Sequence, residues 1–254
     1  MISPALIAAL SRHADLTIAL SGGVDSMTLA HVGSRVLGQR VRVIHAISPA
    51  VPPVATARVQ AHAARAGWRL EFVDAGEFDD PRYRANPVNR CYFCKSNLYA
   101  TIAGLAEGAI ASGTNADDLG DFRPGLKAAE EWKVVHPYVE AGIDKAAIYA
   151  LASYLGLDDL AELPAQPCLA SRVETGLEVK ASDLEFVDQI ERLLRADQGL
   201  SATVRCRITH AGVIVETQGA IPPPEVAAAC QASGRTYLGH RPYRQGAAFL
   251  RAGP

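Results

Sequence analysis

The sequence predicts an α/β fold: a doubly wound parallel sheet in the first part of the chain and a small α+β domain after it. Short apolar runs alternate with segments of helical periodicity through the first half of the 254 residues, which is the pattern of right-handed βαβ units. A Gly-rich turn joins the first apolar run to its helix. Two prolines, Pro164 and Pro167, interrupt the chain before a second set of elements begins.

The first part contains four short apolar, partly β-branched runs that favour strands, namely 16–20, 41–47, 69–73 and 109–112. Helices are expected between and after them: 3–12, from the turn to about 37, 53–67, 96 to about 106, and 143–155. Residues 74–89 are polar and broken by prolines, so we expect a loop there, and 134–137 form a brief extended piece. Ligands of parallel sheets bind at the carboxyl ends of the strands, where the Gly-rich turn lies.

The second part begins at the proline-rich stretch, so we divide the chain into domains 1–165 and 170–254. The pattern predicts an amphipathic helix over 181–195, a β-pair from 203–208 and 212–217, a helix over 222–233 and an extended segment from Tyr237.

The Gly-rich turn reads Ser21-Gly22-Gly23-Val24-Asp25-Ser26. Its backbone N–H groups lie at the positive end of a helix, which is a binding place for phosphate. Gly22 and Gly23 let the backbone approach an anion closely. Asp25 would repel a phosphate, so it indicates a bridging metal ion or contacts that hold the shape of the turn. The alternative is an ordinary helix N-cap, because Ser and Asp are common capping residues.

Cysteines form a second pattern. Cys91 and Cys94 have the spacing of a metal or cluster half-site, and Cys168 follows 74 residues after Cys94. Three thiolates without an obvious fourth partner suit a cluster with one open iron better than tetrahedral zinc. The alternative is that the three are buried as small hydrophobes. Cys206 and Cys230 lie on elements that we expect to be packed, and we predict a structural role for them.

Polar residues follow the strand at 109–112, on the same side of the sheet as the Gly-rich turn. Thr114, Asn115, Asp117 and Asp118 combine paired carboxylates with hydrogen-bonding groups, which suits Mg²⁺ bridging phosphate oxygens. A solvated acidic turn is the alternative. Two cations are candidates for holding phosphates or a substrate anion, with surface charge as the alternative: Arg123 and Lys127.

Arginines mark the second domain. Arg205 and Arg207 alternate on one strand, so both project from the same face and could clamp a phosphate, and Arg244 could join them. The alternative is a solvated strand face. Glu191 and Glu216 are the nearby candidates for an acid or base.

The bulk composition excludes several classes of protein. The net charge of −2 gives no global basic field for nucleic acid. No apolar run reaches the length of about 18 residues that a membrane span needs, and the start of the chain lacks the pattern of a secretory signal. Five cysteines do not indicate a disulfide scaffold. We therefore expect a cytoplasmic protein.

The Gly-rich turn resembles the SGGxDS signature of the PP-loop ATP pyrophosphatases, the adenine nucleotide α-hydrolase-like enzymes that cut ATP between its α- and β-phosphates. Most of the chain resembles one group of them, the LarE-type sulfur transferases. That resemblance rests on the turn and on Cys91-x-x-Cys94-Lys95, Gly113-Thr114-Asn115-x-Asp117-Asp118, Phe122-Arg123-Pro124-Gly125-Leu126-Lys127, Pro167-Cys168-Leu169-Ala170-Ser171-Arg172 and Val204-Arg205-x-Arg207.

The resemblance implies a reaction. ATP, with Mg²⁺, adenylates a carboxylate of pyridinium-3,5-biscarboxylate mononucleotide and releases pyrophosphate. A sulfur nucleophile then displaces AMP, and the thiocarboxylate serves nickel-pincer nucleotide synthesis. Some members sacrifice one cysteine, and others hold a 4Fe–4S cluster on three cysteines, with an open iron that carries sulfide. Cys91, Cys94 and Cys168 resemble the cluster type.

The residue patterns and the resemblance together give expected residue roles, and the resemblance implies an assembly. Catalytic roles are expected for Cys168, Asp25 and Glu191. ATP contacts are expected from Ser21, Gly22, Gly23, Val24, Asp25, Ser26, Thr114, Asn115, Asp118, Arg123 and Lys127. The substrate phosphate is expected on Ser171, Arg172, Arg205, Arg207 and Arg244. Family members form hexamers, so we expect a homo-oligomer. Residues 238–244 lack an Asp that the family carries before its Gly-aromatic-Arg ending, which leaves Arg244 and the exact substrate open.

Three other functions stay open from the sequence. The first is an amide-forming PP-loop synthetase, against which the three cysteines argue. The second is a tRNA-thiolating enzyme, which would need a basic surface that a net charge of −2 does not offer. The third is a nucleotide- or cluster-binding sensor without turnover, which would bind ATP and release no pyrophosphate.

Overall fold

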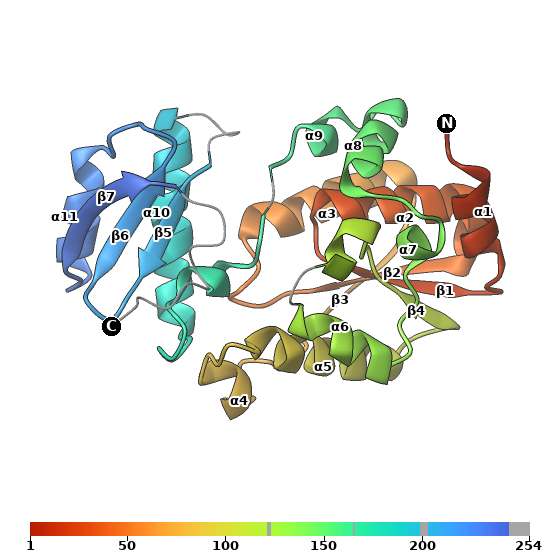
Figure 1. The fold of residues 1–254 in the computed structure, drawn as a ribbon, viewed down its shortest axis with the longest axis horizontal. Helices are drawn as coiled ribbons and strands as arrows, with labels where there is room; N and C mark the ends of the chain where they lie inside the picture. Colours follow the sequence, from red (N-terminus) through yellow and green to blue (C-terminus); the bar gives the residue numbers. More distant parts are fainter. Residues whose placement is uncertain (121–122, 165, 199–202, 244–254) are drawn as a thin grey trace. The chain divides into compact units, whose positions relative to one another are not determined.

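A parallel sheet of four strands is the centre of the first of two structural units (Figure 1). Its strands lie in the order β3 (Arg69–Val73), β2 (Val41–Ala46), β1 (Leu16–Leu20) and β4 (Ala109–Ala111). Leu16 of β1 lies opposite Val41 on one side and Ala109 on the other. All five residues of β1 are buried, as expected for a central strand of a sheet that is covered on both faces.

Helices cover both faces of this sheet (Figure 1). One face carries α2 (Val24–Leu37), α3 (Pro53–Ala66) and α8 (Lys145–Tyr154), and the other carries α5 (Arg90–Ala103) and α6 (Pro124–Glu131). Two separate buried clusters reflect this: Met27, Val59 and Ile148 belong to one, and Ile102 and Ala128 belong to the other. The unit is completed by α1 (Pro4–Ser11), η1 (Gly38–Arg40), η2 (Ala116–Gly120), α7 (Pro137–Glu140) and α9 (Asp158–Ala161). The predicted α/β class with a parallel, doubly wound sheet is confirmed.

The strand order places a topological switch between β1 and β4. The chain moves from β1 through β2 to β3 with its crossover helices on one face, and then returns past β1 to β4 with α5 on the other face. Loops diverge at such a point, and ligands of doubly wound sheets bind in the crevice that they leave. The Gly-rich turn follows β1, and the polar residues from 113 onward follow β4.

The second unit contains a mixed sheet of three strands. Its elements are α4 (Pro81–Arg84), η3 (Leu169–Arg172), α10 (Ala181–Gln198), β5 (Arg205–Ile208), β6 (Val213–Thr217), α11 (Pro224–Ala232) and β7 (Tyr237–Pro242). β5 and β6 are antiparallel, and β7 is parallel to β6. Cys206 and Cys230 are fully buried in this unit, in keeping with a structural role.

The computed structural model describes residues 1–120, 123–164, 166–198 and 203–243. The first unit comprises Met1–Asp79 and Cys91–Gln166, and the second comprises Asp80–Arg90 and the chain from Pro167 onward. The predicted first domain, 1–165, includes residues 80–90. In the structure this segment joins the second unit because its backbone pairs there: Gly176 N–H donates to Asn86 O at 3.0 Å, and Val179 N–H donates to Arg84 O at 2.8 Å.

Several local predictions need correction. The expected loop at 74–89 contains α4, the unpredicted α6 follows Arg123, and the predicted helix 181–195 continues to residue 198. Of the expected extended piece, Val135 makes a single parallel bridge to Ala111, and α7 begins at Pro137 because proline suits the first helical position.

Within the described part of the chain, each helix is too short or too polar to cross a membrane.

Candidate functional site

The turn between β1 and α2 ends in an open helix N-terminus. Gly23 is the N-cap of α2, and no side chain caps the helix, so the interpretation as an ordinary N-cap is wrong. Ser26 fixes the turn instead: its Oγ accepts a hydrogen bond from Ser21 N at 3.1 Å and donates one to Gly23 O at 3.2 Å. The first-turn N–H groups of α2 are therefore left for an anion.

Tight packing holds the turn on two sides. A Cβ on Gly22, whose φ is +82°, would lie 3.2 Å from the carbonyl oxygen of Ala55 on α3. A Cβ on Gly113, just after β4, would lie only 2.7 Å from Ser26 N. Arg58 of α3 donates from Nη1 to Gly22 O at 2.7 Å. The turn is thus pressed between the start of α3 and the end of β4, where only glycine fits.

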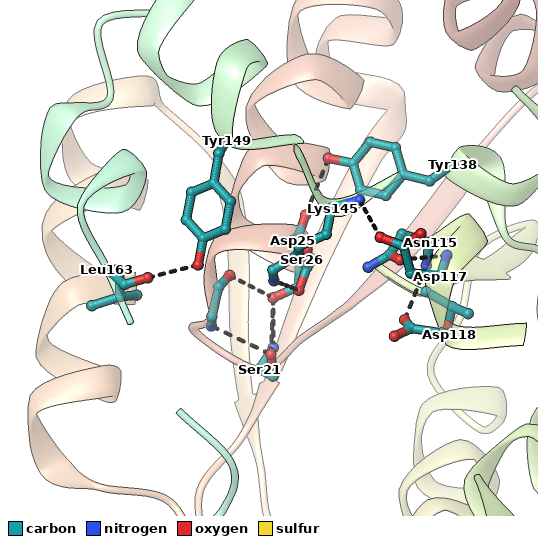
Figure 2. Close-up of polar contacts among 12 residues, drawn as sticks. Ser21, Asp25, Ser26, Asn115, Asp117, Asp118, Tyr138, Lys145, Tyr149 and Leu163 are labelled. Atoms are coloured by element: carbon teal, nitrogen blue, oxygen red, sulfur yellow. Dashed lines mark hydrogen bonds and ion pairs between the residues drawn. The ribbon is translucent and has the colours of Figure 1, made fainter. Parts of the chain in front are cut away.

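An ion pair lies beside the turn (Figure 2). Lys145, the first residue of α8, places Nζ 2.6 Å from Asp25 Oδ2, with side chains that are 32 % and 27 % exposed. Tyr138 Oη donates to Asp25 O at 3.2 Å. Asp25 Oδ1 is buried and has no hydrogen-bond partner among the described residues. A lysine and an orphaned carboxylate oxygen beside an open helix N-terminus suit a phosphate accompanied by a metal ion.

The acidic segment after β4 shapes its own loop (Figure 2). Asn115 N donates to Asp118 Oδ2 at 3.1 Å, and Asp117 N donates to Asn115 Oδ1 at 3.0 Å. Asp117 Oδ2 accepts a hydrogen bond from Lys145 N at 3.0 Å, so it holds the start of α8. These carboxylates support the loop and the position of Lys145, which makes Asp25 the stronger candidate for a magnesium ligand.

The other predicted ATP-binding residues of this unit lie close by. Thr114 Oγ1 is 2.9 Å from Ser112 Oγ, and Arg123 pairs with Asp118 at 2.7 Å. Lys127 is exposed on α6, with Nζ 5.7 Å from the centre of the Tyr92 ring.

Cys91 and Cys94 lie one turn apart on α5, with Cys91 exposed and Cys94 partly buried. A Cβ on Gly125 would lie 3.1 Å from Lys95 Cγ and 3.6 Å from Cys91 O, so the start of α6 packs directly on the cysteine helix. In this way two motifs that are separated in the sequence are brought together.

Arg172 ties the backbone around Cys168 to α10 in the second unit. Its Nε and Nη2 donate to both carboxylate oxygens of Glu191, at 2.8 and 3.0 Å. Its Nη1 donates to the carbonyl oxygens of Pro167 and Cys168, at 2.7 and 3.2 Å. Both side chains are almost fully buried, while Cys168 itself is exposed. The buried guanidinium therefore holds the backbone of a residue whose thiol is accessible.

Two arginines of β5, Arg205 and Arg207, belong to the same polar group as Arg172 and Glu191. Arg207 donates from Nε to Glu216 at 2.9 Å and from Nη1 to Ser171 O at 2.9 Å. The Arg205 guanidinium lies 5.4 Å from the centre of the Tyr243 ring. Both arginines are buried, so the interpretation as a solvated strand face is wrong. Of the predicted phosphate-binding residues, Arg244 lies outside the described residues.

The arginines also set the ionisation of Glu191. Burial alone would raise the pKa of Glu191, but Arg172 outweighs it, Arg195 adds to the effect, and the pKa falls below its usual value. Burial and then Arg172 lower the pKa of Arg205. Glu191 is consequently an ionised, fully paired carboxylate at neutral pH, which suits a positioning role better than proton transfer.

A metal-binding group is not visible within the described ranges, where no three His, Cys, Asp or Glu side chains gather to hold an ion. The cluster on Cys91, Cys94 and Cys168 stays a prediction. Cys91 and Cys94 belong to the first unit and Cys168 to the second.

Comparison with known proteins identifies relatives but no matching family model. The uncharacterized protein slr1717 of Synechocystis is 42% identical over 182 residues, which are 70% of this chain and 68% of that protein. The chain belongs to the slr1717 family. The uncharacterized protein MJ0830 of Methanocaldococcus jannaschii is 27% identical over 188 residues, 72% of this chain and 71% of that protein.

A more informative relative is the pyridinium-3,5-bisthiocarboxylic acid mononucleotide synthase of Lactiplantibacillus plantarum. It is 27% identical over 196 residues, which are 75% of this chain and 71% of the synthase. This distant homologue is an enzyme, and its name supports the resemblance of this slr1717-family chain to the LarE-type proteins.

The sequence analysis missed two cations at the turn of this slr1717-family chain, Lys145 and Arg58. Lys145 carries a local signal, because a lysine in the first turn of a helix opposes the helix dipole and needs a compensating anion. Arg58 carries none: it lies mid-helix on α3, and only the packing of α3 on the turn brings it to Gly22.

Proposed function

We propose that the chain is an ATP-dependent, AMP-forming sulfur transferase that converts a carboxylate of pyridinium-3,5-biscarboxylate mononucleotide to a thiocarboxylate, for nickel-pincer nucleotide synthesis. The printed name of the Lactiplantibacillus plantarum relative supports the substrate. The open N-terminus of α2, with Lys145 and Asp25 beside it, is the observation that carries the ATP-using step.

Different residues of the first unit would bind the phosphates, stabilise the leaving group and hold Mg²⁺. The N–H groups at the start of α2 would bind the phosphates, and Lys145 would stabilise the charge that grows on the departing pyrophosphate. Asp25 would hold Mg²⁺ through its orphaned Oδ1, and the ion would neutralise phosphate oxygens. Tyr138 and Asp117 keep Asp25 and Lys145 in position through their hydrogen bonds.

The residues of the second unit would serve the acceptor and the sulfur. Ser171, Arg205 and Arg207 would bind the substrate phosphate. Cys91, Cys94 and Cys168 would hold a 4Fe–4S cluster with an open iron, which would supply the sulfide. By the same proposal the protein is a cytoplasmic homo-oligomer, a hexamer by the resemblance, with a small nucleotide as substrate and no nucleic-acid partner.

The test is a turnover assay under anaerobic conditions after reconstitution with iron and sulfide. We expect pyrophosphate and AMP to form from ATP and Mg²⁺ only when the pyridinium mononucleotide is present, together with the mass change of an oxygen-to-sulfur exchange in the mononucleotide. Pyrophosphate without sulfur incorporation would indicate a different acceptor chemistry. Binding of ATP without any pyrophosphate would indicate a sensor and overturn the proposal.

Two substitutions of Lys145 test whether the reaction depends on the positive charge of this side chain. Lys145→Met is expected to lower kcat for pyrophosphate formation by about 10²–10³, the usual cost of removing one group that stabilises transition-state charge. Lys145→Arg should keep part of the rate because it retains the charge. Lys180→Met removes an exposed lysine of the second unit and should leave kcat unchanged. A Lys145→Met enzyme with the wild-type rate would remove Lys145 from the ATP site.

A further inference from the structure

A cavity of about 380 Å³ opens on the first unit away from the residues assigned above. It lies between α2, α3 and the segment before α9. Most of its lining side chains can form hydrogen bonds, namely His31, Ser34, Arg35, His62, Arg65 and Trp68, and Ala66 and Leu157 complete the lining. A volume of this size accommodates a small ligand. The proposed reaction uses none of these residues.

A buried polar chain forms one wall of the cavity. His31 Nε2 lies 2.8 Å from His62 Nδ1, and His62 Nε2 lies 2.8 Å from Asp159 Oδ2. His62 is 1% exposed. In the tautomer in which His62 Nε2–H donates to Asp159, Nδ1 of that ring accepts, and His31 donates from Nε2. The second ring nitrogen of His31 then carries a lone pair, and it has no protein partner within the part of the chain described.

The remaining lining offers one indole N–H without an acceptor and two guanidinium groups. Trp68 is 9% exposed, and its Nε1–H is buried without a hydrogen-bond partner among the described residues. Arg65 is only 3.9 Å from Asp159, which His62 already engages at closer range. Arg35 has no acidic partner in the described ranges. A buried donor normally has an acceptor, and of these donors the Trp68 indole N–H is the buried one that lacks it.

We propose that this cavity binds a small phosphate-bearing anion, held by Arg35 and Arg65 with the Trp68 indole N–H as a further donor. Two guanidinium groups and the indole N–H supply more donors than one carboxylate can accept, whereas a phosphate has three or four acceptor oxygens. The site is separate from the open N-terminus of α2, and it does not depend on the proposed reaction.

Binding should be linked to proton uptake at His31. Burial lowers the pKa of His31 to about 4, and the charges of His62, Arg35 and Arg65 act in the same direction, while Asp159 opposes them. A dianion between the arginines offsets their field, so the bound state should raise the pKa of His31 and favour its protonated form. Binding should therefore be accompanied by proton uptake at pH values between the free-state and bound-state pKa of His31.

The experiment uses Trp68 as a reporter. The chain has two tryptophans, so Trp132→Phe leaves Trp68 alone, with the His31 ring 4.7 Å away. Inorganic phosphate, titrated at constant ionic strength, should give a saturable change in the Trp68 emission. In the same background, Arg35→Gln combined with Arg65→Gln should weaken the apparent Kd at least about tenfold. His31→Gln should abolish the proton uptake that calorimetry measures in buffers of different ionisation heat.

Two controls keep the test specific. Arg12→Gln removes an exposed arginine of the same unit and should leave the titration unchanged. Glycerol phosphate in place of inorganic phosphate distinguishes an organic monoester from the free ion, and binding of either supports the site. An emission that does not saturate, or a Kd that the double arginine variant leaves unchanged, would overturn the proposal.

Discussion

Gly113→Ala is expected to abolish pyrophosphate formation while the protein still folds. The added Cβ would lie 2.7 Å from Ser26 N and 2.9 Å from Ser26 Cα, and both are backbone atoms that cannot rotate away. Ser26 belongs to the first turn of α2, so the turn itself must move. The N–H groups that are to bind phosphate would then be misplaced by a fraction of an ångström or more, and catalysis is sensitive to such displacements.

Measurement of ATP affinity and pyrophosphate release tests this expectation. We expect ATP binding to weaken by at least about tenfold and stability to fall by about 1–3 kcal/mol, the range for overpacking a tight site. Gly120→Ala is a matched control, because a Cβ there meets nothing within 4 Å. If Gly113→Ala bound ATP as tightly as Gly120→Ala does, the contact between β4 and the turn would not matter for function.

The first unit was predictable from the sequence because its information is local. The strands 16–20 and 69–73 were predicted with the bounds that the structure gives, since short apolar runs between breakers have few other solutions. The segment 80–90 shows the limit of this reasoning. Its place in the second unit depends on hydrogen bonds from Gly176 and Val179, about ninety residues away, which no local pattern encodes.

The candidate sites likewise combine features that a local sequence pattern predicts with contacts between residues far apart in the sequence. The open N-terminus of α2 followed from six consecutive residues, whereas the Lys145 ion pair joins residues 120 positions apart. Arg172 was predicted to bind a substrate phosphate, a role that stays a prediction. In the structure its guanidinium engages Glu191 and the backbone on either side of the Pro167–Cys168 peptide bond. The arginine was identifiable from its motif, but its partner on α10 was not, because pairing of distant charges leaves no periodic signal.

Glu191→Gln or Arg172→Met alone should be strongly destabilising. Either change leaves the other partner of a buried pair without its charge compensation, which costs about 3–5 kcal/mol. Chemical denaturation measures this cost. Arg84→Gln, which breaks the exposed pair with Glu178 in the same unit, should change stability by no more than about 1 kcal/mol. A loss of similar size in all three variants would contradict the special position of the Arg172–Glu191 pair.

The pair should also make the second unit sensitive to acid. The pKa of Glu191 lies below its ordinary value of 4.5 in the folded protein, so the ionised pair contributes stability that is fully present above the unfolded-state value. That contribution is lost as the pH falls through the lower folded-state pKa. Glu191→Gln should accordingly show a shallower loss of stability on acidification than wild type does, and parallel curves for the two proteins would rule Glu191 out as a source of the acid sensitivity.

The double variant Arg172→Met with Glu191→Gln separates stability from function. It removes both charges of the buried pair together, and Arg195, which also contacts Glu191, is partly exposed. The introduced amide would still offer an oxygen to Cys206 N, which donates to Glu191 Oε1 at 3.1 Å in the wild type. The double variant should therefore be more stable than either single one. The carbonyls of Pro167 and Cys168 would nevertheless lack their guanidinium donor. We expect pyrophosphate release to continue while thiocarboxylate formation falls by about tenfold or more relative to it. Equal recovery of both activities would show that Arg172 only stabilises the unit and does not position Cys168.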